Sequence, residues 1–141
     1  MTDIDPGSEP SLSEHEATQK VLRTDLAVGL GGAVLGYAEA GTALFDVLAV
    51  VVSVSVLTAV AVAVVEHDAV PGVYPEVAAL ASLLVLSGAV AGLVTVSSAP
   101  MTVDLAGALS GFGAGVLANR LLYGVVLDVP AYRLTRVREQ S

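Results

Sequence analysis

Long runs without a charged residue constrain this chain more than any other feature of its sequence. Residues 47–65 and 77–103 contain no Asp, Glu, Lys or Arg, and residues 105–127 contain one, Arg120. A helix needs about 20 consecutive apolar residues to cross the hydrocarbon core of a bilayer. Runs of this length predict an all-α integral membrane protein.

The apolar runs divide most simply into four membrane spans. The stretch from residue 26 to residue 65 is too long for one span, and Gly41-Thr42 offers a turn within it. Pro71 and Pro100 mark the two later connections. We therefore expect a bundle of four antiparallel transmembrane helices, at about residues 24–40, 44–65, 77–98 and 104–127.

The basic residues predict the orientation of this bundle. Lys20 and Arg23 precede the first span, three arginines follow the last, and the connections between spans contain neither Lys nor Arg. Lys and Arg concentrate on the cytoplasmic side of membrane proteins. We expect a multi-pass protein of the plasma membrane with both termini in the cytoplasm. Its parts are a polar tail over 1–23, the transmembrane domain over 24–127 and a basic tail over 128–141.

The polar N-terminal tail contains one clear signal for the start of a helix. Ser13 and Glu16 have the spacing of a capping box, in which each side chain binds the backbone N–H of the other residue. We expect a helix that begins near Ser13 and continues into the membrane.

Two alternatives to this topology stay open at the level of sequence. Lys20 and Arg23, the short apolar run after them and residues 38–40 are also typical of a secretory signal peptide, which would leave three spans. Residues 52–56 and 61–64 alternate between residue types as a membrane β-strand does.

The overall composition excludes several classes of function. Fourteen acids stand against six bases, one of them Lys, so a basic surface for nucleic acid is absent. The chain has no cysteine, which excludes thiolate catalysis and Cys-ligated metals. This acidic, Lys-poor and Val/Ala-rich composition resembles that of proteins from halophilic organisms. We predict no cofactor and no nucleic-acid partner.

Glycines at intervals of four residues form the strongest local pattern. Small residues at this spacing let two helix backbones approach closely in a membrane. They indicate packing faces, either inside one bundle or between protomers. The glycines concerned are Gly32, Gly36, Gly88, Gly92, Gly107, Gly111 and Gly115.

Arg120 and its neighbour Asn119 form a candidate intramembrane polar site. A charged residue inside a span is a functional hypothesis by default. Arg120 could bind an anion or pair with a carboxylate. It lies near the predicted cytoplasmic end, so it could also extend outward to lipid phosphate or to Asp25.

Other charged residues gather near the predicted membrane surfaces. Glu39, Asp46 and Asp104 should form an acidic rim at the outer face, either as a cation funnel or as an acidic surface. At the inner face we expect lipid headgroups to contact Arg133, Arg136 and Arg138.

The remaining sequence lacks a set of residues for catalysis or metal binding. No nucleophile–base pair falls within a span, so we do not expect an enzyme. Residues 66–68 read Glu-His-Asp, but adjacent residues rarely converge on one metal without a second cluster, and we predict no metal site. The expected function is an accessory or structural subunit of a membrane assembly, with the bilayer and a partner helix or a second copy as partners. The alternative is a homo-oligomeric small transporter or channel with its pathway between protomers.

Overall fold

The computed structural model describes residues 13–67 and 72–139, which are helical apart from short connections and contain no strand. The four longest helices are long and apolar enough to cross a membrane, which confirms the prediction of an all-helical chain with four helices of spanning length. In chain order the elements are α1 (Glu14–Ala40), η1 (Gly41–Phe45), α2 (Leu48–Glu66), α3 (Pro75–Val96), α4 (Met101–Leu121), η2 (Leu122–Val126) and α5 (Ala131–Glu139).

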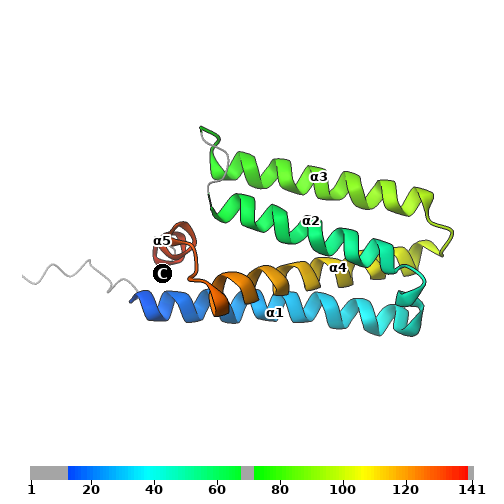
Figure 1. Cartoon of the computed structure of the whole chain (residues 1–141), viewed down its shortest axis with the longest axis horizontal. Coiled ribbons are helices and arrows are strands. Elements are labelled where there is room, and N and C mark those ends of the chain that lie inside the picture. Colours follow the sequence, from blue (N-terminus) through cyan, green and yellow to red (C-terminus); the bar gives the residue numbers. More distant parts are fainter. Residues whose placement is uncertain (1–12, 68–71, 140–141) are drawn as a thin grey trace, which may run out of the picture.

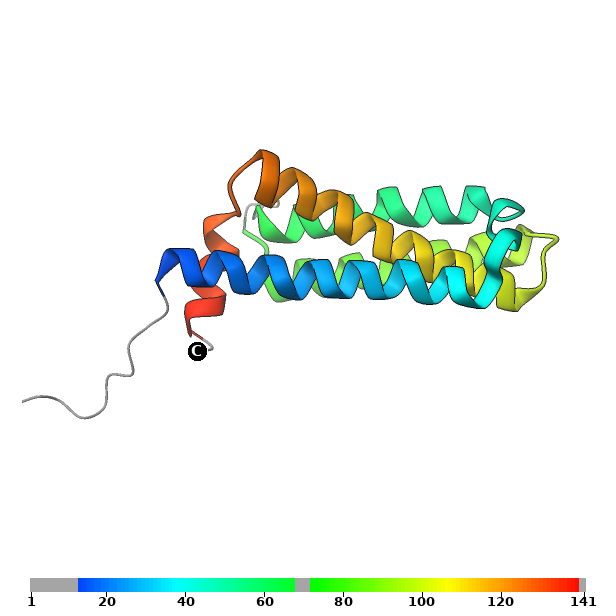
Figure 2. The same ribbon diagram turned by 90° about the horizontal axis from the view of Figure 1, so that it is seen from below.

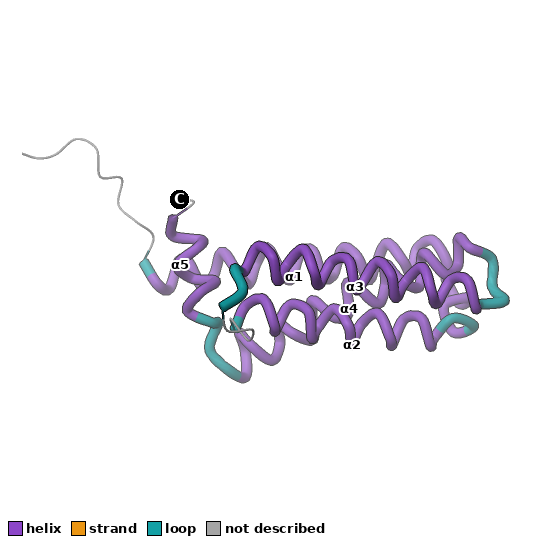
Figure 3. Tube along the Cα trace, turned by 90° about the horizontal axis from the view of Figure 1, so that it is seen from above, coloured by secondary structure: helices purple, strands orange, loops and turns teal. Residues whose placement is uncertain are grey.

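The four long helices lie lengthwise beside one another (Figure 1). The connections from α1 to α2 and from α3 to α4 lie at one end of the molecule. The end of α2, the start of α3, the start of α1 and the whole of α5 lie at the other end (Figures 1 and 3). We call this second end the α5 end. The view from below shows α5 crossing it beside the first turns of α1 (Figure 2).

α1 is a single helix of 27 residues, so the expected tail helix and the expected first span are continuous. The predicted capping box is confirmed at its start. The Ser13 hydroxyl accepts a hydrogen bond from the Glu16 backbone N–H at 3.3 Å, and the Glu16 carboxylate accepts one from the Ser13 backbone N–H at 3.0 Å. These bonds satisfy two of the backbone groups that a helix start leaves without a partner.

Turn residues end the helices near the predicted positions. Gly41 follows α1 with a positive φ of 55°, a conformation that glycine adopts without a steric cost, and the short helix η1 then leads into α2. Pro75 begins α3 and Pro100 caps α4, where a missing N–H costs nothing. Most helix bounds therefore lie within four residues of the predicted spans. The exceptions are α1, which begins at Glu14 as the capping box predicts, and α4, which ends at Leu121, six residues before the predicted bound.

α4 lies at the centre of the packing because glycines let it approach two neighbours at once. On one side, a Cβ at Gly111 would lie 2.5 Å from the Val51 carbonyl oxygen of α2 and 2.9 Å from Val54 Cβ. Gly107 and Gly115 make similarly close approaches to Val47 and Thr58. Gly107, Gly111 and Gly115 thus face α2 along one seam.

A second seam joins α4 to α1. A Cβ at Gly32 would lie 3.1 Å from the Gly113 Cα atom of α4. A Cβ at Gly36 would collide with Ser110 and with the Ala106 carbonyl oxygen of α4. Gly29 continues the same face against Leu117. This seam explains why the buried residues of α1 recur every three or four positions.

α3 is the peripheral helix of the four. It packs mainly on α2, and none of its residues is buried. Gly88 and Gly92 have open space where a Cβ would lie, so these two glycines do not mark a packing face within the chain. Their spacing indicates close packing in a membrane only if a second chain supplies the other helix.

Candidate functional site

A buried cluster of charged residues lies near the α5 end. Its centre is Arg120, in the last turn of α4, whose exposed fraction is 1%. The Arg120 Nη2 atom lies 2.9 Å from the Asp25 Oδ2 atom of α1, and it also pairs with the Glu66 carboxylate at the end of α2. Three helices that are far apart in the sequence therefore meet at one guanidinium group.

α5 adds a second arginine to this cluster. The Arg133 Nη2 atom donates to the Asp25 Oδ1 atom at 3.1 Å, and the Arg133 Nε atom lies 3.7 Å from the Glu66 Oε1 atom. Arg133 is only partly buried, so it closes the cluster on its outer side. We refer to Asp25, Glu66, Arg120 and Arg133 as the charge cluster.

The charge cluster carries formal charges that sum to zero, because two arginines stand against two carboxylates. Moving an ion out of water costs several kcal/mol, and this cost is offset only when the ion has partners in good geometry. Arg120 pairs with two carboxylates, those of Asp25 and Glu66, so it needs no lipid phosphate as a partner. Of the fates expected for Arg120, the structure shows the pairing with a carboxylate.

Hydrogen-bonding capacity remains unused within the charge cluster. Among the residues that the structure describes, Arg120 Nε and Nη1 and Glu66 Oε2 are buried and have no hydrogen-bond partner. The Thr58 hydroxyl, eight residues or about two turns before Glu66 in α2, is likewise buried and has no hydrogen-bond partner among the described residues. Buried polar groups without partners are uncommon, and each one needs an explanation.

The side chains of Asn119 and Arg120 make separate contacts. Its side-chain amide donates to the Ala59 carbonyl oxygen of α2 at 3.2 Å. Adjacent positions on a helix point about 100° apart, so Asn119 faces α2 within the seam whereas Arg120 faces the charge cluster. The two residues predicted as one polar site therefore serve two contacts.

A cavity of about 310 Å³ adjoins the charge cluster. All four members of the cluster line it, together with Thr58 and with Ser82 of α3. The rest of its wall is apolar and comes mostly from α2, α3 and α4, with Val62, Leu83, Leu86 and Phe112 among the larger side chains. The cavity thus has a charged region and an apolar region.

The expected acidic rim exists only in part. Glu39 and Asp46 are exposed at the end opposite to α5, but Asp104 is fully buried and neither of its carboxylate oxygens has a hydrogen-bond partner among the described residues. Asp104 departs from the expectation because it precedes Gly107 and Gly111 by three and seven residues. It therefore shares the face of α4 that carries the seam.

The arginines of the C-terminal tail also differ from one another. Arg133 belongs to the charge cluster rather than standing free for lipid, and the Arg138 Nη2 atom lies 4.0 Å from the exposed Glu14 carboxylate. The side chain of Arg136 lies outside the described residues. Contact between these arginines and lipid headgroups stays a prediction.

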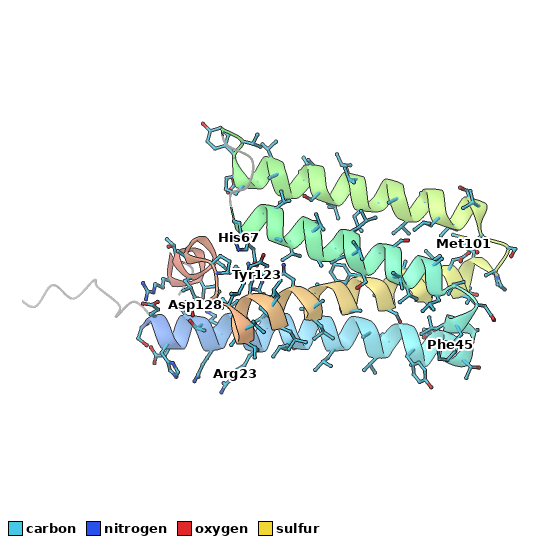
Figure 4. The ribbon with its side chains drawn as sticks, viewed as in Figure 1. Arg23, Phe45, His67, Met101, Tyr123 and Asp128 are labelled. Atoms are coloured by element: carbon cyan, nitrogen blue, oxygen red, sulfur yellow. The ribbon has the colours of Figure 1, made fainter. Side chains whose placement is uncertain are left out.

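Glu66 and His67, which are adjacent in the Glu66-His67-Asp68 sequence, lie in different environments. Glu66 is buried in the charge cluster, whereas His67 is exposed and its ring lies 4.4 Å from the ring of Tyr123. Figure 4 shows His67, Tyr123 and Asp128 at the α5 end, opposite to Phe45 and Met101. Asp68 lies outside the described residues.

Sequence reasoning missed Glu66 as a partner of Arg120, and it missed Arg133 as the second arginine of the charge cluster. A partial signal was present, because Asp25 and Glu66 are among the acids that the four-span topology places at the ends of spans on the same side as Arg120. A single base inside a span should attract such acids.

Comparisons with models of protein families, with curated proteins and with solved structures find no match for this chain.

Proposed function

We propose that this chain is a multi-pass protein of the plasma membrane, and that it serves as a non-enzymatic subunit of a larger membrane assembly. In this proposal α1 to α4 form an antiparallel four-helix bundle across the bilayer, and α3 contacts the partner subunit. The observation that carries the proposal is that α3 has the length and apolarity of a span but buries none of its residues within the chain.

The distribution of bases supports the orientation. Arg120, Arg133 and Arg138 lie at the α5 end, and Lys20 and Arg23 belong to the part of α1 that begins there. The positive-inside rule then places this end in the cytoplasm, with both termini. α5 would lie at the cytoplasmic surface of the bilayer.

The outward face of α3 has the character of a helix-contact surface. Gly88 and Gly92 lie open on it, and the nearby Leu84 and Val85 are well exposed. In a membrane, helices associate through close packing at small residues, because lipid tails remove the hydrophobic driving force that operates in water. A partner helix could approach the backbone of α3 closely at these two glycines.

A matched pair of leucine substitutions tests this contact. Gly92 of α3 and Gly31 of α1 both have open space at the Cβ position, so Gly92→Leu and Gly31→Leu should both leave the fold intact. Native mass spectrometry in mild detergent should show an assembly for the wild type and for Gly31→Leu, and a monomer for Gly92→Leu. If Gly92→Leu leaves the assembly unchanged, or if the wild type is a monomer, the α3 contact is wrong.

The composition of the assembly decides between the two functions considered from the sequence. A foreign chain in fixed stoichiometry supports the subunit proposal. A pure homo-oligomer supports instead a small transporter or channel with its pathway between protomers. That alternative has less support from the charge cluster, because Arg120 is neutralised by Asp25 and Glu66 inside one protomer.

A further inference from the structure

We infer that the cavity beside the charge cluster binds a neutral membrane amphiphile, with a hydroxyl- or carbonyl-bearing head at Arg120 and an apolar chain between α2, α3 and α4. A monoacylglycerol has this chemistry. The inference concerns a single protomer and does not rest on the partner proposed for α3.

The first argument is the unused hydrogen-bonding capacity. Arg120, Glu66 and Thr58 all line the cavity, and each has a buried polar atom without a partner among the described residues. The unused groups are two nitrogen atoms of Arg120 (Nε and Nη1), one carboxylate oxygen of Glu66 and the hydroxyl of Thr58. A buried donor or acceptor without a partner destabilises the folded protein. A ligand that accepts from Arg120 and donates to Glu66 would remove this cost.

The second argument is the charge of the site. Each arginine of the charge cluster already faces a carboxylate, and the formal charges sum to zero. An anionic head would add a third negative charge beside two arginines, and a cationic head would add a third positive charge beside two carboxylates. Either would leave the buried site with a net charge, which is costly. A hydroxyl or ester group fits the unused atoms without breaking an ion pair, so the site favours a neutral head.

The third argument is the shape and the lining of the cavity. Its volume of about 310 Å³ lies at the lower end of the range of roughly 300–1,000 Å³ that small-molecule pockets occupy. Apolar side chains such as Leu83 and Phe112 continue the wall away from the charged residues. A few polar groups in a mostly apolar pocket is the arrangement that orients an amphiphilic ligand.

Two further cavities beside α3 provide a contrast. They measure about 380 Å³ and 530 Å³, and no charged residue lines either of them. Lipid chains can fill these grooves without any specific recognition. The cavity at Arg120 differs because it combines an apolar wall with unused donors and acceptors.

Titration of the purified protein with monoolein, read by native mass spectrometry, tests the inference. One molecule should bind per chain, and oleate and phosphatidylglycerol should bind at least tenfold more weakly. Oleate has the same acyl chain as monoolein, so the comparison isolates the head. Equal or stronger binding of either anionic lipid would contradict the neutral head, and absence of saturable monoolein binding would reject the site.

Two variants of the cavity wall and one control variant test where the monoolein molecule binds. Ala79 lines the cavity at Arg120 and Ala91 lines the cavity of about 530 Å³, and both are exposed alanines of α3. Ala79→Phe should weaken monoolein binding at least tenfold, whereas Ala91→Phe should leave it unchanged. Thr58→Val keeps the shape of the side chain but removes the hydroxyl, and should weaken binding about three- to tenfold, as expected for one hydrogen bond. Binding that resists both Ala79→Phe and Thr58→Val would overturn the inference.

Discussion

Asp25 of α1 uses its two carboxylate oxygens for two different arginines: Oδ2 lies 2.9 Å from Arg120 Nη2 of α4, and Oδ1 lies 3.1 Å from Arg133 Nη2 of α5. Glu66 of α2 completes the same cluster. One carboxylate therefore connects the long helices α1 and α4 to the C-terminal helix α5. The cluster lies where four elements meet, so Asp25, Glu66 and Arg120 should each affect the stability of the bundle, and Arg133 should affect the attachment of α5.

Removal of Arg120 should destabilise the fold strongly. Arg120→Leu would leave Asp25 and Glu66 in a buried site with only the partly exposed Arg133 to balance them. The loss of one partner from a buried ion pair typically costs about 3–5 kcal/mol. We expect the free energy of unfolding, measured by circular dichroism during denaturation from mild detergent, to fall by this order. The matched variant Arg120→Lys keeps the charge but loses the forked geometry, and it should fall between the two.

Removal of Arg133 should release α5 without unfolding the bundle. Arg133→Ala deletes the contacts of α5 with Asp25 and Glu66 while the contacts of Arg120 remain. Amide hydrogens of α5 should then exchange faster in hydrogen–deuterium exchange, and those of α4 should not change. Arg138→Ala is the control, because its partner Glu14 is exposed and 4.0 Å away, and such pairs contribute about 0–1 kcal/mol. Equal protection of α5 in wild type and Arg133→Ala would show that other contacts hold it.

The sequence predicts the helices of this chain better than it predicts their faces. Uncharged runs and turn residues locate four helices, because length and apolarity are read directly from the residues. α2 and α3 are apolar on all sides, so no hydrophobic stripe tells which side turns inward. Glycine spacing is a partial guide to these faces. Gly111 marks the seam between α4 and α2, whereas Gly88 has the same spacing but open space at its Cβ position.

The charged residues were harder to place for a related reason. Burial of Asp25 and Glu66 depends on the rotation of α1 and α2 about their axes, and that rotation is fixed by packing against α4. Asp104 could have been placed from the sequence, because its distance from Gly107 and Gly111 puts it on their face of the helix. The acidic rim was expected to include Asp104 because an acid at the start of a span was assumed to face water, and this assumption was wrong for Asp104.

Substitution of glycine by alanine should have opposite effects on stability at a packed glycine, Gly111, and at an open one, Gly88. At Gly111 the new methyl group would lie 2.5 Å from the Val51 carbonyl oxygen, so α4 and α2 would have to move apart and several kcal/mol of stability should be lost. At Gly88 the methyl group meets no atom, and alanine should stabilise the helix by up to about 1 kcal/mol. Thermal denaturation of Gly111→Ala and Gly88→Ala checks both signs. Similar melting temperatures for the two variants would mean that the seam between α4 and α2 is looser than the structure shows.

Asp104 should be a position where the native residue costs stability. Its carboxylate is fully buried and lacks a hydrogen-bond partner among the described residues, and a buried charge without a partner is expensive. Asp104→Asn preserves the shape and removes the charge, so we expect the variant to unfold at a higher denaturant concentration than the wild type. Asp25→Asn is the matched control, because Asp25 has two arginine partners and its neutralisation should destabilise the protein. If Asp104→Asn instead lowers stability as Asp25→Asn does, the carboxylate is stabilised at its buried position and the native residue carries no cost.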